Sequence, residues 1–392
     1  MKLLIYDTIL FMKGDEIMLD KERAIHRFME LVQIDSVSLN EKDVAAYLRA
    51  YFENLGYTVI HDDKSHESVP QANTGNIIVK IPGRGAKAHE DTIMLQAHMD
   101  TVEPGEGVKP QLSEDANYIT SDGTTILGAD DKAGIAQMME VEAVLRTHEL
   151  DHPPLEFLFT ISEEIGLLGS FNLDSSLVDA KIAYVLDGDG GPGAAIIGGP
   201  DYYDIVGSIK GRAAHAGVAP ETGISSIQVL SKAIANMNLL KIDEDTTTNI
   251  GRVICDYPTN VVPEITRFEM EVRSLDADKA LKQIDHVKKT LEEACEAFGA
   301  TLEIEVSKSL SAYKHSEDNK VLKLFKDMCD RHNLDYRPMV IRGGTDVSGL
   351  MANGIDAICL ATGGEYAHEL KERLDIEEFM ENIQQLIWLI TD

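Results

Sequence analysis

The sequence predicts an α/β protein in which a mixed-sheet domain is interrupted by a smaller domain of βαββαβ order. Five short apolar runs, separated by segments of helical periodicity, favour a sheet covered by helices on both faces. The stretch from about residue 204 to residue 312 instead alternates strands and helices in the order of a ferredoxin-like unit. At 392 residues, 44% of them apolar, the chain is long enough for both domains.

The N-terminal part is predicted to be helical from Lys21 onwards. Residues 21–57 have the periodicity of two helices, and the second stops at Gly56. Residues 1–17 are apolar in places, but they lack a clear basic n-region and a small-residue cleavage site. We therefore expect no export signal and no membrane span, and we treat residues 1–17 as an N-terminal extension with Met18 as an alternative start.

The larger domain is predicted from residues 18–203 and 313–392. A helix is expected from Asp131 to His148, between two of its strands. The strand candidates, each with a short apolar run, are TGNIIVKIPG, DTIMLQAHMD, PLEFLFTISEE, AKIAYVLDGDG and GIDAICLATGGEYAH.

The inserted domain is predicted to span residues 204–312, a typical size for a small domain. Its expected elements are the strand YDIVGSIKG, the helix SSIQVLSKAIANM, the strands NIGRVIC and ITRFEMEVRS, the helix ADKALKQIDHVKKTLEEACEAFG and the strand TLEIEVSKSL.

Charge and cysteine content exclude several classes of partner. The formal net charge of -31 opposes binding to nucleic acid or to anionic membranes. The four cysteines are widely separated and form no CxxC pair, which favours a reducing, cytoplasmic compartment.

Polar side chains follow four of the predicted strands closely. One strand that ends in a charged residue means little, because strand ends and turns are often polar. Four such ends would meet at one edge of an α/β sheet, where the carboxylates would repel one another unless cations lay between them. The residues are His98 and Asp100, Glu163 and Glu164, Asp187, and His368.

Imidazole and carboxylate ligands together favour zinc over calcium or magnesium. Asp130, at the start of the helix after Gly128, would be an N-cap in isolation, but a carboxylate can also bridge two metals. Asp100 can accept the second imidazole N–H of His98. In the pair Glu163 and Glu164, one residue can bind metal while its neighbour takes a proton from water.

These residues lie in segments that resemble a known family. HMDT, DGTTILGADDKAG, SEEIGLLGS, LDGDGG, GRAAHAGVAPETGISS, RGGTDVSGL and AHE are similar to the co-catalytic di-zinc peptidases, which include peptidase T, carboxypeptidase G, succinyl-diaminopimelate desuccinylase and aminoacylase. The resemblance runs from about Asp20 to the end of the chain, and LGADDKAG and IRGGTD are most similar to the peptidase T branch.

The resemblance implies a role for each matching residue. His98 and Asp187 would bind one zinc, Glu164 and His368 the other, with Asp130 as the bridge; Glu163 would be the general base and Asp100 the partner of His98. The peptide between Asp130 and Asp131 is expected to be cis. The inserted domain would serve as a lid and dimerisation domain, in which His215 stabilises the oxyanion in a partner's site. Substrate contacts are implied for Asn260, Arg273, Arg342 and Gly344.

The expected activity is zinc-dependent hydrolysis of small peptides by a homodimer, as a tripeptide aminopeptidase, with Co2+ or Mn2+ able to replace Zn2+. The segment NVVP resembles the carboxypeptidase and aminoacylase members instead, so an N-acyl amino acid deacylase or a dipeptidase remains an alternative. A catalytically inert peptide- or zinc-binding protein would lack a ligand or the base, whereas every expected position is filled. A dehydrogenase-like fold is disfavoured because no G-x-G-x-x-G follows a first strand.

Overall fold

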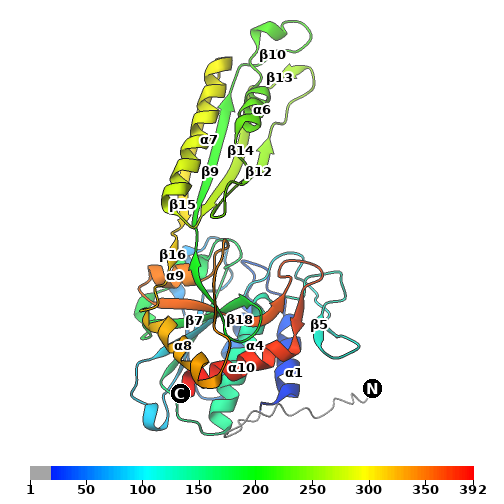
Figure 1. The fold of residues 1–392 in the computed structure, drawn as a ribbon. Helices are drawn as coiled ribbons and strands as arrows, with labels where there is room; N and C mark the ends of the chain where they lie inside the picture. The colour runs from blue at the N-terminus through cyan, green and yellow to red at the C-terminus, as the bar shows by residue number, and fades with distance from the viewer. Residues whose placement is uncertain (1–18) are drawn as a thin grey trace. The chain divides into compact units, whose positions relative to one another are not determined.

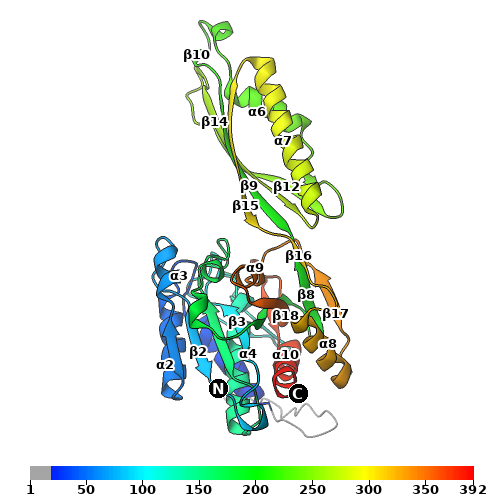
Figure 2. The ribbon, with the colours of Figure 1, turned by 90° about the vertical axis from the view of Figure 1, so that its left-hand side faces the viewer.

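The computed structural model describes residues 19–392, so the predicted N-terminal extension and Met18 lie outside the described residues. The chain divides into two compact units. Unit 1 comprises the segments up to Ile197, His315–Met339 and Thr345–Asp392, and unit 2 comprises Gly198–Lys314 and Val340–Gly344. Figures 1 and 2 show their helices and strands.

Twelve strands form the larger sheet in the described part of the chain. The main path runs in the order β1-β2-β6-β3-β7-β18-β19-β5-β4, and β8 pairs with β16, β17 and β18. The strands are β1 (Thr58–His61), β2 (Ile77–Ile81), β3 (Ile93–His98), β4 (Gln111–Leu112), β5 (Tyr118–Thr120), β6 (Leu155–Thr160), β7 (Ile182–Asp189), β8 (Ala194–Gly199), β16 (Tyr313–Lys314), β17 (Arg337–Val340), β18 (Asp356–Glu365) and β19 (Arg373–Asp375).

The strands at the centre of this sheet are parallel, and the strands toward its edges are antiparallel. β3 runs parallel to β6 and β7, and β7 runs parallel to β18, whereas β2 is antiparallel to β6. Every residue of β6 is buried, as expected for a strand covered on both faces. The predicted mixed sheet is therefore confirmed, and β3, β6, β7 and β18 bring their carboxyl ends to one edge.

Helices cover this sheet, and α4 is the one that most directly positions the site. It packs against β3, β7 and β18, and also against α1 and α10. Gly134 permits this close approach, because a Cβ there would lie 2.4 Å from the Leu186 carbonyl oxygen on β7. The helices are α1 (Lys21–Val32), α2 (Lys42–Asn54), α3 (Asp63–Ser68), α4 (Ala129–Thr147), α5 (Leu168–Phe171), α8 (Lys320–His332), α9 (Val347–Ala352) and α10 (Ile376–Thr391).

Unit 2 has the predicted βαββαβ order. Its antiparallel sheet runs β11-β12-β14-β9-β15, and α6 and α7 pack on it over a separate apolar core that includes Ile205, Phe268 and Leu291. The outward residues of β14 are mostly charged, so one face of the sheet is apolar and the other polar. The elements are β9 (Asp201–Lys210), β10 (Ala214–His215), α6 (Ser226–Asn236), β11 (Leu240–Lys241), β12 (Thr246–Ile254), β13 (Val261–Val262), β14 (Ile265–Ser274), α7 (Ala277–Phe298) and β15 (Thr301–Leu310).

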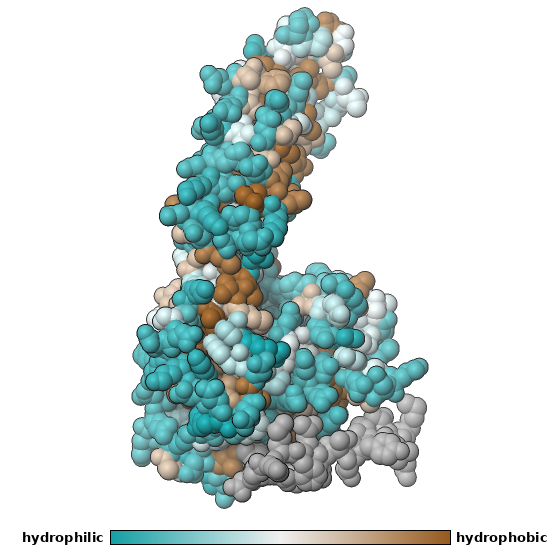
Figure 3. Space-filling model, in the orientation of Figure 1, coloured by the Kyte–Doolittle hydropathy of each residue, from teal (hydrophilic) through white to brown (hydrophobic). Residues whose placement is uncertain are grey.

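The surface is in keeping with the acidic composition. Hydrophilic residues dominate the face drawn in Figure 3, with hydrophobic residues gathered along part of unit 2. Within residues 19–392, none of the helices combines the length and the apolar content that crossing a membrane requires.

Candidate metal centre

Four parallel strands of unit 1 deliver the predicted ligands to one edge of the sheet. His98 is the last residue of β3, and Asp187 lies near the end of β7. Glu164 follows β6, and His368 follows β18 by three residues. Asp130 lies in the first turn of α4. The structure thus brings together side chains that are up to 270 residues apart in sequence (368 − 98 = 270).

The His98 imidazole is buried, and its two nitrogens face different groups. Nδ1 lies 2.9 Å from the Asp100 carbonyl oxygen and 3.5 Å from the Asp100 carboxylate. Nε2 lies 2.9 Å from Asp130 Oδ1 and 3.7 Å from Asp187 Oδ1. Because Asp100 offers only acceptors to Nδ1, this nitrogen carries the proton and Nε2 is left to bind a metal.

Asp130 lies between the two histidines. Its Oδ1 faces His98, and its Oδ2 lies 3.3 Å from Nε2 of His368. His368 Nε2 is also 2.9 Å from the Glu164 carboxylate. The centre therefore has two halves, one with His98 and Asp187 and one with His368 and Glu164, and Asp130 presents one oxygen to each.

The electrostatics reflect this crowding of acids. Burial, reinforced by the Asp130 carboxylate, raises the pKa of Asp187 to about 7. Burial also raises the pKa of Asp130, but its contacts with His368 and His98 outweigh that effect and lower the pKa. The same contacts to Asp130 and Glu164 raise the pKa of His368 to about 10.

The Asp100 carboxylate organises the loop that carries the two glutamates. It accepts the backbone N–H groups of Glu163 and Glu164, at 2.9 and 3.2 Å, in addition to the Ser38 hydroxyl at 2.7 Å. Asp100 thus does more than the predicted contact with His98, in which its backbone carbonyl is closer than its carboxylate.

Ser162, just before this pair, has a left-handed backbone with φ of 53°, which is costly for a residue other than glycine. Glu41 offsets that cost by accepting both the Ser162 N–H, at 3.0 Å, and its hydroxyl, at 3.1 Å. The turn lets adjacent glutamates serve one site although neighbouring strand residues point oppositely.

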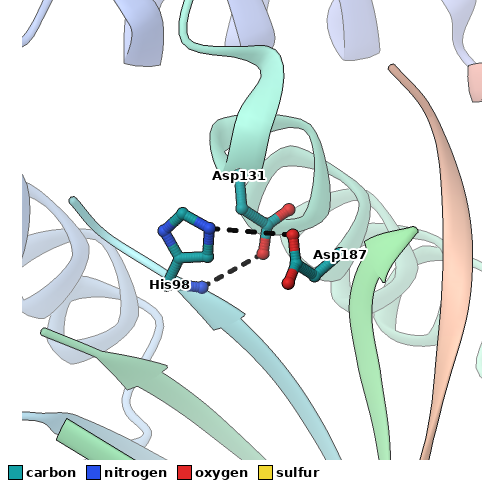
Figure 4. A group of neighbouring side chains, drawn as sticks. All are labelled: His98, Asp131 and Asp187. Atoms are coloured by element: carbon teal, nitrogen blue, oxygen red, sulfur yellow. Dashed lines mark hydrogen bonds and ion pairs between the residues drawn. The ribbon is translucent and has the colours of Figure 1, made fainter. Parts of the chain in front are cut away.

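Asp131 lies beside the centre but already has partners for both oxygens. Figure 4 shows its carboxylate above the backbone nitrogen of His98, with Asp187 facing the imidazole. Asp131 Oδ2 accepts the His98 N–H at 3.1 Å, and Oδ1 accepts the Gly134 N–H at 3.1 Å. Although its oxygens are close enough to join His98 and Asp187 at a metal, we assign Asp131 to positioning β3 on α4. The peptide between Asp130 and Asp131 is cis, as expected.

Glu372 is a residue that the sequence analysis missed. It is buried, and its Oε2 accepts the N–H groups of Leu127 and Gly128, both at 2.7 Å, while Oε1 accepts the Asp130 N–H at 3.0 Å. Burial raises the pKa of Glu372 to about 7. In the sequence it belongs to the charged run HELKERLD, whose composition is typical of a solvent-exposed turn.

His215, Asn260 and Arg273, which were predicted in the inserted domain, lie in unit 2. Arg342 and Gly344 were predicted in the larger domain, within residues 313–392, but they lie in unit 2 as well. The five residues form two separate groups. His215, in β10, pairs with Val261 of β13, and the Asn260 carbonyl accepts the Ala216 N–H. Arg273 donates to the Arg342 carbonyl at 3.3 Å, two residues before Gly344. Ile265, beside the first group, is eight positions from Arg273 in β14 (273 − 265 = 8), so the groups lie about 27 Å apart along the strand.

Replacing Glu372 with Gln should loosen the centre without removing a ligand. An amide can accept at one atom only, so it would present an N–H to at least one of the three backbone donors. We expect metal affinity to fall roughly 10- to 100-fold, as for other changes behind a ligand. Zinc titration against a chromophoric chelator measures this. Glu377→Gln, an exposed change five residues along, is the control; equal affinity in both variants would contradict the role of Glu372.

Comparisons with known proteins agree with this geometry. Residues 94–391 match the model of the peptidase family M20/M25/M40. The uncharacterized protein YqjE of Bacillus subtilis is 37% identical, covering 96% of this chain and 99% of that protein. The crystal structure of aminopeptidase PepT from Bacillus cereus has a TM-score of 0.84 at 36% identity, and that of a tripeptidase from Staphylococcus aureus has 0.88 at 34%. Both matches cover 95% of this chain and 98% of the other. The chain therefore belongs to peptidase family M20/M25/M40 and is a metallopeptidase of the peptidase T-like kind.

Proposed function

We propose that the protein is a di-zinc aminopeptidase that removes the N-terminal residue of small peptides, with tripeptides as the preferred substrates. The observation that carries this proposal is the position of Asp130, which offers one oxygen to each of two histidine-carboxylate pairs. The names of the similar structures, an aminopeptidase and a tripeptidase, support the substrate class.

The donor set suits two zinc ions. Two imidazoles and three carboxylates exceed the four ligands of a single tetrahedral zinc. His98 and Asp187 would hold one ion and Glu164 and His368 the other, with Asp130 shared; Co2+ or Mn2+ could replace Zn2+. When bound, the ions would polarise the scissile carbonyl and lower the pKa of a bound water.

Glu163 is the proposed general base. Its side chain is 9% exposed, and its backbone is fixed by Asp100. Burial, with Asp187 among the neighbouring acids, raises the pKa of Glu163 well above its usual range. A carboxylate in such a position can take a proton from the attacking water and return it to the leaving nitrogen.

Glu163→Gln and Glu164→Gln form a matched pair of variants in adjacent positions. Glu163→Gln should bind two zinc ions per chain and lose most of its turnover, because only the proton acceptor is removed. Glu164→Gln should bind the second zinc more weakly, because a ligand is removed. Zinc titration with parallel assays tests both; the opposite pattern would exchange the two roles, and a single binding event in the wild type would exclude the two-metal site.

A small acidic cavity beside the centre favours an aminopeptidase over a deacylase. It has a volume of about 20 Å³, enough for one group the size of a water molecule or an ammonium. Besides Asp130 and Asp187, it is lined by Asp189 and Glu365. Carboxylates attract the protonated N-terminus of a peptide, whereas an N-acyl amino acid has an uncharged acyl chain on that side of the scissile carbonyl.

Asp189→Asn should therefore reduce kcat/KM for tripeptides roughly tenfold, equivalent to about 1.4 kcal/mol. It should not reduce kcat/KM for N-acyl amino acids. The assay compares zinc-loaded protein on tripeptides, dipeptides and N-acyl amino acids, with Asp330→Asn on the exposed face of α8 as the control. If the wild-type protein hydrolyses N-acyl amino acids fastest, the result would favour a deacylase. If it hydrolyses dipeptides fastest, the result would favour a dipeptidase. If it hydrolyses none of these substrates, the result would favour a catalytically inert binding protein.

Unit 2 is proposed to act as a lid and dimerisation domain. A tripeptide is at most about 11 Å long, so His215 and Arg273, at opposite ends of unit 2, cannot both contact it from one chain. We assign Arg273, Arg342 and Gly344 to one active site and His215 with Asn260 to that of a partner. Nδ1 of His215 accepts the Gly217 N–H at 3.1 Å, which leaves the proton on Nε2 for donation to an oxyanion.

His215→Ala should keep both metals and lose roughly 100- to 1,000-fold in turnover, as expected for loss of one oxyanion donor. Mixing it with Glu163→Gln protein under subunit-exchange conditions should restore part of the activity, because one site of the mixed dimer then has an intact base and an intact histidine. Absence of recovery despite demonstrated exchange would place His215 in its own chain's site, and full turnover in the single variant would remove it from the mechanism.

We also propose a cytoplasmic location. All four cysteines are free in the described residues, which agrees with a reducing compartment.

A further inference from the structure

Unit 1 contains a second cavity, of about 280 Å³, at the C-terminal part of α4. None of the proposed metal ligands lines it. The lining residues are Tyr57, Ile81, Pro82, Gly83, Arg84, Glu142, Leu145, Arg146 and His152. The volume is close to the lower end of the range for small-molecule sites.

The cavity has two buried acceptors on its wall. The Glu142 side chain is 1% exposed, and its Oε1 accepts the Tyr57 hydroxyl at 2.8 Å and the Arg146 Nε–H at 2.7 Å. Its Oε2 has no hydrogen-bond partner within the described residues. Nδ1 of the buried His152 lies 2.8 Å from the Pro153 carbonyl, so that nitrogen carries the proton and Nε2 is an acceptor. Buried acceptors normally have donors, so these favour a ligand with N–H groups.

Two arginines supply the opposite charge. Arg84 pairs with Glu149 through one Nη at 2.8 Å, and Arg146 uses its Nε for Glu142. Each guanidinium has five N–H donors, so both retain donors for a carboxylate. Both side chains are 45% exposed, so a ligand can reach them from solvent. Arg146 is balanced by Glu142 on the wall, and Arg84 by Glu149, which lies outside the lining, so the site suits a ligand that carries both charges and has no net charge.

We propose that this cavity binds a small α-amino acid with an apolar side chain. Glu142, with His152, would accept the ammonium group, Arg84 and Arg146 would bind the carboxylate, and Ile81, Pro82 and Leu145 would contact the side chain.

The site is separate from the metal centre but lies on the same helix. Glu142 is 12 residues from the proposed ligand Asp130 (142 − 130 = 12), or about 18 Å at the rise of an α-helix. Amino acids are also what peptide hydrolysis releases; this link to a product rests on the proposed function, whereas binding in the cavity does not.

Calorimetric titration of zinc-loaded full-length protein with L-leucine tests the site. Glu142→Gln should weaken leucine binding at least tenfold. Glu140→Gln is the matched control on the same helix, because Glu140 is equally buried and paired with arginines, Arg23 and Arg27, but does not line the cavity. N-acetyl-L-leucine, which lacks the ammonium group, should bind weakly to all variants.

Arg84→Gln provides a second test at a side chain that is 45% exposed. It should weaken binding of L-leucine but leave that of L-leucinamide, which lacks the carboxylate, unchanged. Leucine bound as a product at the metal centre would be insensitive to both Glu142→Gln and Arg84→Gln, and that result would overturn the proposal. So would the absence of saturable leucine binding to the wild type. These outcomes do not depend on turnover, so they are distinct from failure of the proposed aminopeptidase activity.

Discussion

The structure of unit 1 depends on holding several carboxylates close together at one edge of a sheet. Asp130, Glu164 and Asp187 approach two imidazoles within hydrogen-bond or ion-pair distance. Such crowding is unfavourable in a buried site unless cations compensate it. Parallel β3, β6, β7 and β18 impose it, because their carboxyl ends share that edge. The arrangement therefore favours the binding of divalent metal ions.

A surrounding layer of carboxylates fixes the residues of the candidate metal centre. Asp100, Asp131 and Glu372 each bind backbone N–H groups of segments that carry a proposed ligand or the base. Asp346 links two neighbouring strands through their side chains: its carboxylate accepts hydrogen bonds from the Gln96 amide of β3 at 2.6 Å and from the Thr160 hydroxyl of β6 at 2.5 Å. The sheet and α4 fix these backbone donors, so the hydrogen bonds to them restrict the positions of the proposed ligands.

Sequence patterns predicted the elements that have regular apolar periodicity. The apolar runs gave the central strands, and polar residues at their ends gave His98, Glu164, Asp187 and His368. Among the supporting carboxylates, Asp100 was predicted as the partner of His98. Glu41 and Glu372 could not be found this way, because they lie in polar segments and their burial depends on contacts across 121 and 242 residues. The short strands β10 and β13 were also missed, because two residues carry no periodicity. The separation between Asn260, which precedes β13, and Arg273, near the far end of β14, could be seen only from the strand register.

Glu372 holds the loop before α4 from a position 242 residues further along the chain than Asp130. Contacts of such long sequence separation carry a high cost of loop closure. The central strands and the metal centre are therefore ordered by different contacts. Pairing of β3, β6 and β7 leaves the Asp130 N–H without its acceptor until the segment after β18 has packed beside α4.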